Sequence, residues 1–311
     1  MAKEYDLVIV GAGISGLSAG MYAGRLGLKT LCLGASSAEE MAIGGIITTT
    51  SDIDNFPGYI KISGIELAER IRKHAEEYGI EIKEERVKAI EKKEEDFVVK
   101  TDKNNYLAKT VLIATGTERR KLEAKNADKF ENKGVVYCAY CDAHLFKDKI
   151  VAIVGGANAA AKEALLLAGK AKKVYIIYRK EKLRAEKAFM DKIENEKKIE
   201  IINNANVLEV RGDKVVRGVV LDREYNGSRE LKLDGIFVAL GNTASSEIVH
   251  DLNVELNEKN EIKTNKNCET NVPGVYAAGD VTDREWKQAI TAVAEGCIAA
   301  YSAFKYLKSK K

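Results

Sequence analysis

Residues 5–34 read YDLVIVGAGISGLSAGMYAGRLGLKTLCLG. An apolar run, a glycine-rich turn, an amphipathic pattern and a second apolar run follow one another, which predicts a strand, a helix and a second strand. Gly11, Gly13 and Gly16 give the spacing GxGxxG between the first strand and the helix. The first glycine permits a tight turn, the second lets the backbone approach a pyrophosphate, and the third lets the helix lie close to the strand. The stretch therefore predicts a dinucleotide-binding βαβ unit.

The end of this unit departs from the general fingerprint. An acidic residue is expected near position 34, where it would bond a ribose hydroxyl, but the second strand ends in LCLGASS. The nearest acids are Glu39 and Glu40. The ribose contact is therefore left open.

A second stretch repeats the order of the first. Residues 149–179 read KIVAIVGGANAAAKEALLLAGKAKKVYIIYR. Ala157 stands where the middle glycine is expected, and its methyl group would crowd a pyrophosphate. Basic residues occupy the strand end where an acid would favour NADH, and they suit the 2′-phosphate of NADPH. These residues are Arg179, Lys180 and Arg184.

Two nucleotide-binding domains follow from the repeat. We expect an outer, discontinuous domain in residues 1–118 and 243–311 and an inner domain in residues 119–242. The fold class is α/β, with two Rossmann-like domains, the second inserted in the first. In the outer domain GIELAERIRKHAEEYG predicts a helix with Ile65, Leu67, Ala68, Ile71 and Ala75 near one face. A final helix is expected from Trp286 to Leu307.

Composition sets the limits of the interpretation. The chain has 311 residues, of which 45% are apolar and 31% charged, as in a globular protein with room for two domains. No membrane span or secretion signal is indicated, so we expect a cytoplasmic protein. The net charge of +3 gives no indication of nucleic-acid binding. Residues 119–242 hold 26 Lys and Arg against 18 Asp and Glu, which fits either chance or an anionic ligand there.

The stretch YCAYCDAHLF, residues 137–146, contains two cysteines separated by two residues. A structural zinc site would need a second pair or two suitably spaced histidines, and haem attachment would need a histidine at position 142. Neither condition is met, so no metal site is predicted. The pattern favours a redox dithiol, with Asp142 beside it as a proton donor or acceptor. The other cysteines stand alone and are interpreted as small apolar residues: Cys32, Cys268 and Cys297.

The order of these motifs resembles a known family over essentially the whole chain. GAGISG, TTT, DNFPG, ATGT, CAYCD, a second glycine turn, the basic strand end, GVYAAGD and KQAIT are similar to the low-molecular-weight thioredoxin reductases of archaea and bacteria. The resemblance implies FAD in the outer domain, and NADPH with the redox cysteines in the inner one. Electrons would pass from NADPH through FAD to the Cys138–Cys141 disulfide, and on to thioredoxin or a glutaredoxin-like protein. It also implies a homodimer.

The resemblance carries site residues over position by position. The catalytic positions are Cys138, Cys141 and Asp142. The FAD positions are Gly11, Gly13, Ile14, Ser15, Gly16, Gly44, Gly45, Asn55, Val87, Thr115, Gly116, Gly279, Asp280, Lys287, Gln288 and Ala289. The NADPH positions are Gly155, Gly156, Asn158, Ala159, Arg179, Lys180 and Arg184.

Several positions depart from the family pattern. Ile46 replaces a glutamine, Ala143 a glycine and Lys287 an arginine, and NTASSE after Gly241 lacks the family's proline. Together with Ala157, these departures leave the electron donor open among NADPH, NADH, a deazaflavin and ferredoxin. An NAD(P)H oxidase with an accessory dithiol is a second alternative. A nucleotide-binding protein without turnover is a third, and it gives no reason for the CxxC.

Overall fold

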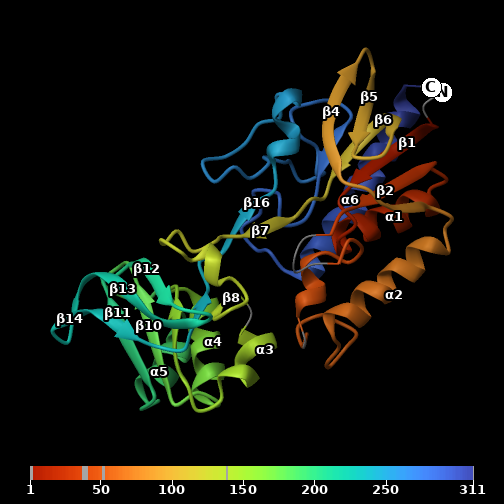
Figure 1. Cartoon of the computed structure of the whole chain (residues 1–311). Coiled ribbons are helices and arrows are strands. Elements are labelled where there is room, and N and C mark those ends of the chain that lie inside the picture. The colour runs from red at the N-terminus through yellow and green to blue at the C-terminus, as the bar shows by residue number, and fades with distance from the viewer. Residues whose placement is uncertain (1–2, 37–40, 51–52, 138, 311) are drawn as a thin grey trace. The chain divides into compact units, whose positions relative to one another are not determined.

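A computed structural model describes residues 3–36, 41–50, 53–137 and 139–310, and the side chains of Tyr140 and Cys141 lie outside that description. The chain divides into two compact units (Figure 1). The first combines Met1–Glu118 with Thr243–Lys311, and the second is Arg119–Asn242. Each unit is built on a mainly parallel sheet with helices, so the α/β fold class predicted from the glycine turns is confirmed.

The sheet of the first unit has the strand order β3-β2-β1-β6-β5-β4, and β17 also pairs with β6. Its strands are β1 (Lys3–Val10), β2 (Thr30–Gly34), β3 (Glu81–Glu84), β4 (Val87–Lys93), β5 (Asp96–Thr101), β6 (Asn105–Ile113) and β17 (Val275–Ala277). The two halves of β6 have different partners on one side: Asn105–Ala108 pairs antiparallel with β5, and Val111–Ile113 pairs parallel with β17. The carboxyl ends of β1, β6 and β17 therefore meet at one edge.

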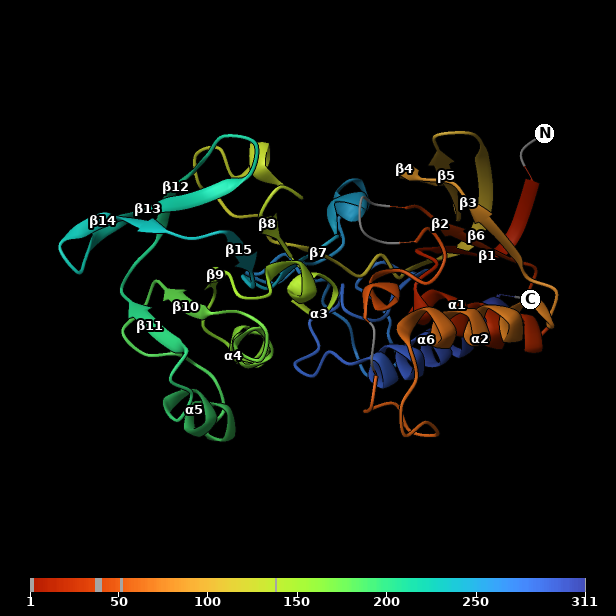
Figure 2. The ribbon, with the colours of Figure 1, turned by 60° about the horizontal axis from the view of Figure 1, so that its bottom comes forward.

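Three helices accompany this sheet: α1 (Ile14–Arg25), α2 (Gly64–Glu76) and α6 (Ala289–Ser309). The first packs against the other two, and Figure 2 shows the three side by side. Small residues allow this approach, because a Cβ atom on Gly296 would lie 2.2 Å from the carbonyl oxygen of Ser15. Short 3-10 helices complete the unit: Ile46–Thr49 and Glu247–Leu252.

Two details of these helices differ from the sequence expectation. Ile65 is 55% exposed, whereas Leu67, Ala68 and Ala75 of the same helix are buried. The last helix begins at Ala289 and not at Trp286, because Gln288 and Thr291 form a capping box that fixes its start.

The second unit contains a five-stranded parallel sheet in the order β11-β10-β9-β15-β8 and a three-stranded antiparallel sheet in the order β12-β13-β14. The strands are β8 (Val135–Val136), β9 (Ile150–Val154), β10 (Lys173–Tyr178), β11 (Ile199–Asn203), β12 (Val207–Gly212), β13 (Val216–Tyr225), β14 (Ser228–Lys232) and β15 (Gly235–Val238). The helices are α3 (Ala139–Asp142), α4 (Asn158–Ala168) and α5 (Lys187–Glu194), with 3-10 turns at Asp128–Phe130 and Ala143–Phe146.

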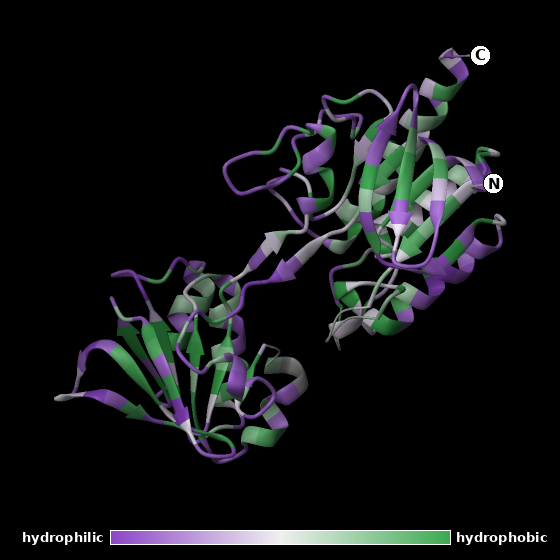
Figure 3. Cartoon of the chain, turned by 45° about the horizontal axis from the view of Figure 1, so that its top comes forward, coloured by the Kyte–Doolittle hydropathy of each residue, from purple (hydrophilic) through white to green (hydrophobic). Residues whose placement is uncertain are grey.

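Each parallel sheet is buried on both faces, as parallel sheets require. In β1 alternate residues enter different core clusters: Val8 and Val10 lie in one, Leu7 and Ile9 in the other. The strand β9 divides its side chains between two clusters in the same way. Figure 3 shows apolar residues gathered on the strands of both units.

Two short strands, β7 (Thr117–Arg119) and β16 (Asn242–Ala244), connect the units and pair with each other. Among the described residues, no helix is long and apolar enough to cross a membrane.

Candidate active site

The glycine turn after β1 has no room for a side chain at Gly11 or Gly16. Gly11 has φ +112°, and a Cβ atom there would lie 2.2 Å from the carbonyl oxygen of Ala114 at the end of β6. A Cβ atom on Gly16 would lie 1.9 Å from the carbonyl oxygen of Gly11. Both distances are far below van der Waals contact, so the turn is fixed by glycine at these two positions. The turn brings the start of α1 to the edge where β1 and β6 end.

The first turn of α1 offers unused hydrogen-bonding groups. Gly13 is its N-cap and supplies no side-chain cap, so the N–H groups that follow, beginning at Ile14, point away from the helix without an intrahelical acceptor. The hydroxyl of Ser15 is buried and has no hydrogen-bond partner among the described residues. An orphaned buried hydroxyl beside a helix N-terminus fits an anionic ligand such as a pyrophosphate.

A second glycine pair lies against this turn. Gly44 donates its N–H to the carbonyl of Ala12 at 2.8 Å, and a Cβ atom on Gly45 would lie 3.1 Å from the Cα atom of Gly13. Both residues of the pair have positive φ, +113° and +67°. Two glycine segments thus lie against each other and form one backbone cradle.

The ends of β6 and β17 complete this edge. Thr115 donates its hydroxyl to the carbonyl of Ser245 at 2.6 Å, and Gly116 follows it with φ +67°. Gly279 comes two residues after β17 with φ +80°, and a Cβ atom there would lie 3.1 Å from the Cβ of Ser15. Asp280 follows, and burial raises the pKa of its carboxyl group while Lys287 opposes the change. A carboxyl group is therefore held beside the glycine cradle.

Three more predicted FAD residues lie at the start of α6: Lys287, Gln288 and Ala289. Gln288 caps the helix, and its side-chain oxygen accepts a hydrogen bond of 2.8 Å from Asn55. Ala289 is the first helical residue. Lys287 forms an ion pair with Glu261, a residue that the sequence pattern did not single out. Asn55 and Gln288 are thus joined across a long stretch of chain.

Val87 is a predicted FAD residue that lies in the sheet and not at a glycine turn. Val87 begins β4 and packs, partly buried, against the core of the sheet. Glu39 and Glu40, the acids nearest to the end of β2, lie outside the described residues.

The glycine turn of the second unit is similarly tight. Gly155 has φ +154°, and a Cβ atom there would lie 2.3 Å from the carbonyl oxygen of Ala239 at the end of β15. A Cβ atom on Gly156 would lie 2.3 Å from the ring of Tyr178. Ala157 is the N-cap of α4 and is exposed, as is Ala159 in the first turn. The methyl group of Ala157 therefore stands where a pyrophosphate would approach the helix.

The segment after β10 folds back onto this turn. Arg184 donates its backbone N–H to the carbonyl of Gly156 at 2.6 Å and its Nε–H to the hydroxyl of Tyr178 at 3.0 Å. Asn158 and Glu186 exchange two hydrogen bonds, of 2.6 and 2.8 Å. Sequence reasoning did not find Glu186. The cationic side chains themselves are exposed at the strand end: Arg179, Lys180 and Arg184.

The cysteine stretch lies at the short helix α3. Cys138 and the side chain of Cys141 are outside the described residues, although the backbone of Cys141 belongs to α3. This helix packs against α4, the helix that follows the second glycine turn. Burial raises the pKa of the Asp142 carboxyl, and the charges of His144 and Arg119 partly offset that effect. Asp142 is thus more readily protonated than an exposed aspartate.

A second carboxyl group occupies the same region. Glu163 lies in α4, and its Oε2 atom is buried without a hydrogen-bond partner among the described residues. Burial raises its pKa to about 7, and Arg119 acts in the opposite direction. No spacing rule marks Glu163 in the sequence.

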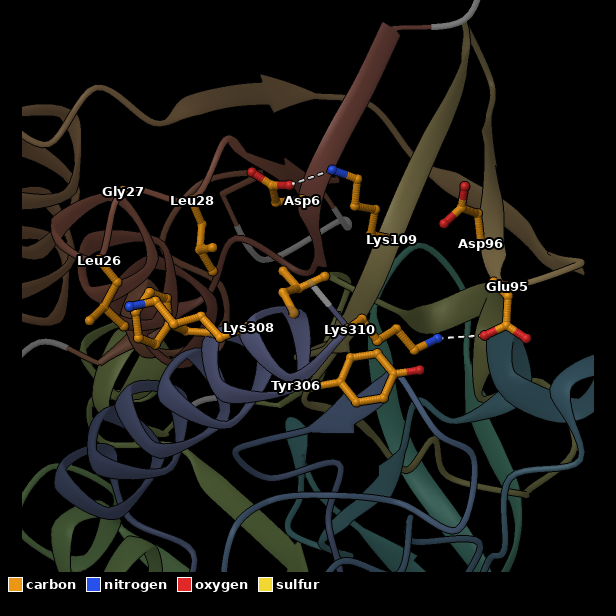
Figure 4. Close-up of a pocket in the computed structure, with 12 residues that line it drawn as sticks. Asp6, Leu26, Gly27, Leu28, Glu95, Asp96, Lys109, Tyr306, Lys308 and Lys310 are labelled. Atoms are coloured by element: carbon orange, nitrogen blue, oxygen red, sulfur yellow. Dashed lines mark hydrogen bonds and ion pairs between the residues drawn. The ribbon is translucent and has the colours of Figure 1, made fainter.

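The remaining cysteines and a peripheral cavity are separate from these features. Cys32 and Cys268 are buried, and Cys297 is partly exposed with its sulfur 3.0 Å from the Ser18 hydroxyl. Where the chain is described, no group of three or more His, Cys, Asp or Glu residues could hold a metal. A cavity of about 520 Å³ lies beyond the carboxyl end of α1, at Leu26–Leu28, and the end of α6. Figure 4 shows residues that line it. The cavity is therefore remote from the glycine cradle at the amino end of α1.

Comparison with known proteins agrees with this geometry. Residues 5–296 match the family model described as pyridine nucleotide-disulphide oxidoreductase. The thioredoxin reductase of Treponema pallidum is 37% identical over 309 residues, which cover 99% of this chain and 98% of that relative. The solved thioredoxin reductase of Lactococcus lactis has a TM-score of 0.87 at 34% identity, covering 98% of this chain and 99% of that one.

A third relative has a different electron donor in its name. A ferredoxin-flavin thioredoxin reductase from Clostridium acetobutylicum has a TM-score of 0.54 at 34% identity and covers 99% of this chain and 100% of that one. Full-length similarity in sequence and fold leads to one assignment: the chain belongs to the pyridine nucleotide-disulphide oxidoreductases, among the low-molecular-weight thioredoxin reductases.

Proposed function

We propose that this protein is a thioredoxin-disulfide reductase that takes electrons from NADPH and delivers them through FAD and the Cys138–Cys141 pair to thioredoxin or a glutaredoxin-like protein. The observation that carries the proposal is the position of the cysteine helix. The helix α3, which lies in the cysteine stretch, packs against α4, the helix that follows the second glycine turn. A dithiol beside a nucleotide site suits a route in which electrons pass from a nicotinamide through a flavin to a disulfide.

The first unit would hold FAD at the glycine cradle. The N–H groups at the start of α1 and the free hydroxyl of Ser15 would bind the pyrophosphate. The carboxylate of Asp280 would accept a hydrogen bond from a ribityl hydroxyl. Bound there, the flavin would supply the two-electron chemistry that links a nicotinamide to a disulfide. Thr115 and Gly116 follow β6 at the same edge of the sheet, and Gln288 caps the start of α6.

The second unit would hold NADPH at its own glycine turn. Arg179, Lys180 and Arg184 are exposed at the end of β10, where the adenosine 2′-phosphate is expected. Their charge distinguishes NADPH from NADH. The pairing of Asn158 with Glu186 means that Asn158 shapes the turn more than it contacts the ligand.

The reduced cysteine pair would act by thiol–disulfide exchange. One thiolate attacks the partner disulfide, forming a mixed disulfide and releasing a partner thiolate, which takes up a proton. The second cysteine then attacks the mixed disulfide, so that the partner leaves as a dithiol and Cys138 and Cys141 are oxidised together. Asp142 is suited to supply the proton, because its raised pKa increases the fraction in the acid form.

Three further features support the expected partners and compartment. Leu145 is 57% exposed and lies four residues after Cys141, where it offers an apolar contact to a docking protein. Tyr22, Ile298 and Tyr301 are exposed on the packed helices α1 and α6, which supports a homodimer through this face. Free cysteines at positions 32, 268 and 297 support a reducing cytoplasm.

A second candidate donor is reduced ferredoxin or a deazaflavin. The exposed methyl group of Ala157 and the carboxylate of Glu186 both lie at the start of α4, and both oppose a nucleotide pyrophosphate. The similarity to a ferredoxin-flavin thioredoxin reductase favours the same alternative. A weakened second nucleotide site would explain both observations.

Anaerobic titration tests the proposal. Purified protein reconstituted with FAD is mixed with NADPH, and the flavin absorbance is followed. Bleaching by about one equivalent of NADPH, and steady turnover when oxidised thioredoxin is added, is the expected result. NADH is the parallel arm, and Cys138→Ser with Cys141→Ser is the control that should bleach but not turn over. Absence of bleaching with NADPH would exclude it as the donor.

A further inference from the structure

The segment that carries Gly279 and Asp280 is held in place by contacts on several sides. We call residues 279–288 the Asp280 strap. Its early part pairs with residue 262: Ile262 donates to the carbonyl of Val281 at 2.9 Å, and Asp283 donates to the carbonyl of Ile262 at 3.0 Å. Its far end is joined to Asn55 through Gln288. The strap is thus a constrained element and not a free loop.

Glu295 is the residue of α6 that holds the beginning of the strap. Its Oε2 atom accepts a hydrogen bond of 2.8 Å from the backbone N–H of Gly279. Its Oε1 atom forms an ion pair of 3.3 Å with Nε of Arg284, in the middle of the strap. The Glu295 side chain is only 13% exposed. One carboxylate therefore ties two points of the strap to the helix.

Glu295 accepts its hydrogen bond from Gly279, the residue directly before Asp280. Gly279 has φ +80°, a conformation that only glycine adopts easily, and its N–H would lack this acceptor if the carboxylate were removed. The turn also touches Ser15, since a Cβ atom on Gly279 would lie 3.2 Å from the unpartnered Ser15 hydroxyl. The Glu295 hydrogen bond is thus made where the strap meets the start of α1.

A second acid holds the far part of the strap. Glu261 forms an ion pair with Lys287, and its other oxygen accepts a hydrogen bond of 2.7 Å from Asn257. Lys287 in turn acts on the carboxyl group of Asp280. The strap is therefore held by a carboxylate on each side of Asp280. Glu295 accepts a hydrogen bond from Gly279, and Glu261 pairs with Lys287.

We propose that Glu295 is a positioning residue for the flavin: it fixes the Gly279–Asp280 turn so that Asp280 meets the sugar-alcohol chain of FAD. The inference rests on the proposed FAD site. It assigns Glu295 no contact with the ligand itself. Glu295 acts only through the backbone of Gly279 and through Arg284.

The test compares ligands that reach Asp280 with ligands that do not. FAD spans both the glycine turn and Asp280, whereas ADP offers only the pyrophosphate and the adenosine. Glu295→Ala, Glu295→Gln and Asp280→Ala are prepared as apoproteins, and binding of FAD and of ADP is measured by calorimetry. Glu81→Gln is the matched control, because Glu81 is a hydrogen-bonded carboxylate of the same sheet that lies on β3, outside the strap.

Glu295→Ala is expected to weaken FAD binding by about 10- to 100-fold and ADP binding by less than about 2-fold. Glu295→Gln keeps an acceptor for the Gly279 N–H and should restore FAD affinity to within about 3-fold of wild type. In the Asp280→Ala background, Glu295→Ala should add little, because the two residues act in series.

Three results would overturn the inference: equal losses for FAD and ADP, unchanged FAD affinity in Glu295→Ala, or full additivity with Asp280→Ala. Equal losses would mean that the substitution damages the fold generally. If the wild-type protein itself binds no FAD, the proposed function fails together with this inference. If the wild type binds FAD and Glu295→Ala binds it equally well, only this inference fails.

Discussion

Glu163 provides a test of electrostatics inside the second unit. The change is Glu163→Gln, which keeps the shape of the side chain and removes its charge. Burial raises the pKa of Glu163 to about 7 from an ordinary value of 4.5. Between pH 4.5 and about pH 7 the folded state therefore keeps a proton on Glu163 that the unfolded state has lost. The free energy of unfolding must fall as the pH rises through this window.

The magnitude follows from the same two values. A difference of one pKa unit corresponds to about 1.36 kcal/mol, so the gap from 4.5 to about 7 amounts to about 3 kcal/mol at high pH. Below pH 4.5 the glutamate is protonated in both states and the cost is absent. The glutamine is neutral throughout, so Glu163→Gln should be more stable than the wild type at pH 8. The gain should be about 2–3 kcal/mol larger at pH 8 than at pH 5.

Hydrogen exchange followed by mass spectrometry is the suitable assay, because it resolves the second unit from the first. Peptides that cover β9 and α4 are compared between the variant and the wild type at both pH values. Glu194→Gln, an exposed glutamate of α5 with the same chemical change, is the control and should give no pH-dependent difference. A gain from Glu163→Gln that is equal at pH 5 and pH 8 would refute the reasoning.

Three other substitutions test the two nucleotide sites. Gly16→Ala should cost more than about 2 kcal/mol and abolish flavin binding, because the new methyl group would lie 1.9 Å from the Gly11 carbonyl oxygen; thermal melting and flavin content measure this, and a normal flavin content would contradict it. Ala157→Gly should lower the KM for NADPH about 3- to 10-fold without changing the KM for thioredoxin, since it removes the methyl group at the pyrophosphate. An unchanged KM for NADPH would show that this methyl group does not limit binding. Arg179→Gln should raise the KM for NADPH about 10-fold and leave the KM for NADH unchanged; equal effects on both nucleotides would argue against a 2′-phosphate contact.

The local features of the fold and site could be predicted from the sequence. GxGxxG between a strand and a helix is a short-range pattern, and Gly11 and Gly16 are glycine for steric reasons that the structure makes explicit. The same holds for the parallel α/β class, which follows from two copies of that pattern. The boundary of the last helix was harder to place, because the Gln288–Thr291 capping box competes with an apolar pattern that begins earlier.

The acids around the sites could not be predicted. Glu163, Glu186, Glu261 and Glu295 each act through contacts that only the folded chain creates. Glutamate is common in this sequence and is usually a solvated surface residue. The role of Glu295 depends on the backbone N–H of Gly279, sixteen positions away in the sequence. Ile65 illustrates the opposite error, since an apolar residue at helical spacing is exposed.

The dual pairing of β6 has a consequence for how the protein is made. β1, β2 and β6 are translated early, but β17, which pairs with β6, and α6 are translated after the whole second unit. On the ribosome, the inserted unit is complete while the first still lacks β17, the strand that precedes Asp280, and the helix α6 that packs on α1. The order of biosynthesis therefore completes the inserted unit before the glycine cradle of the first unit is closed.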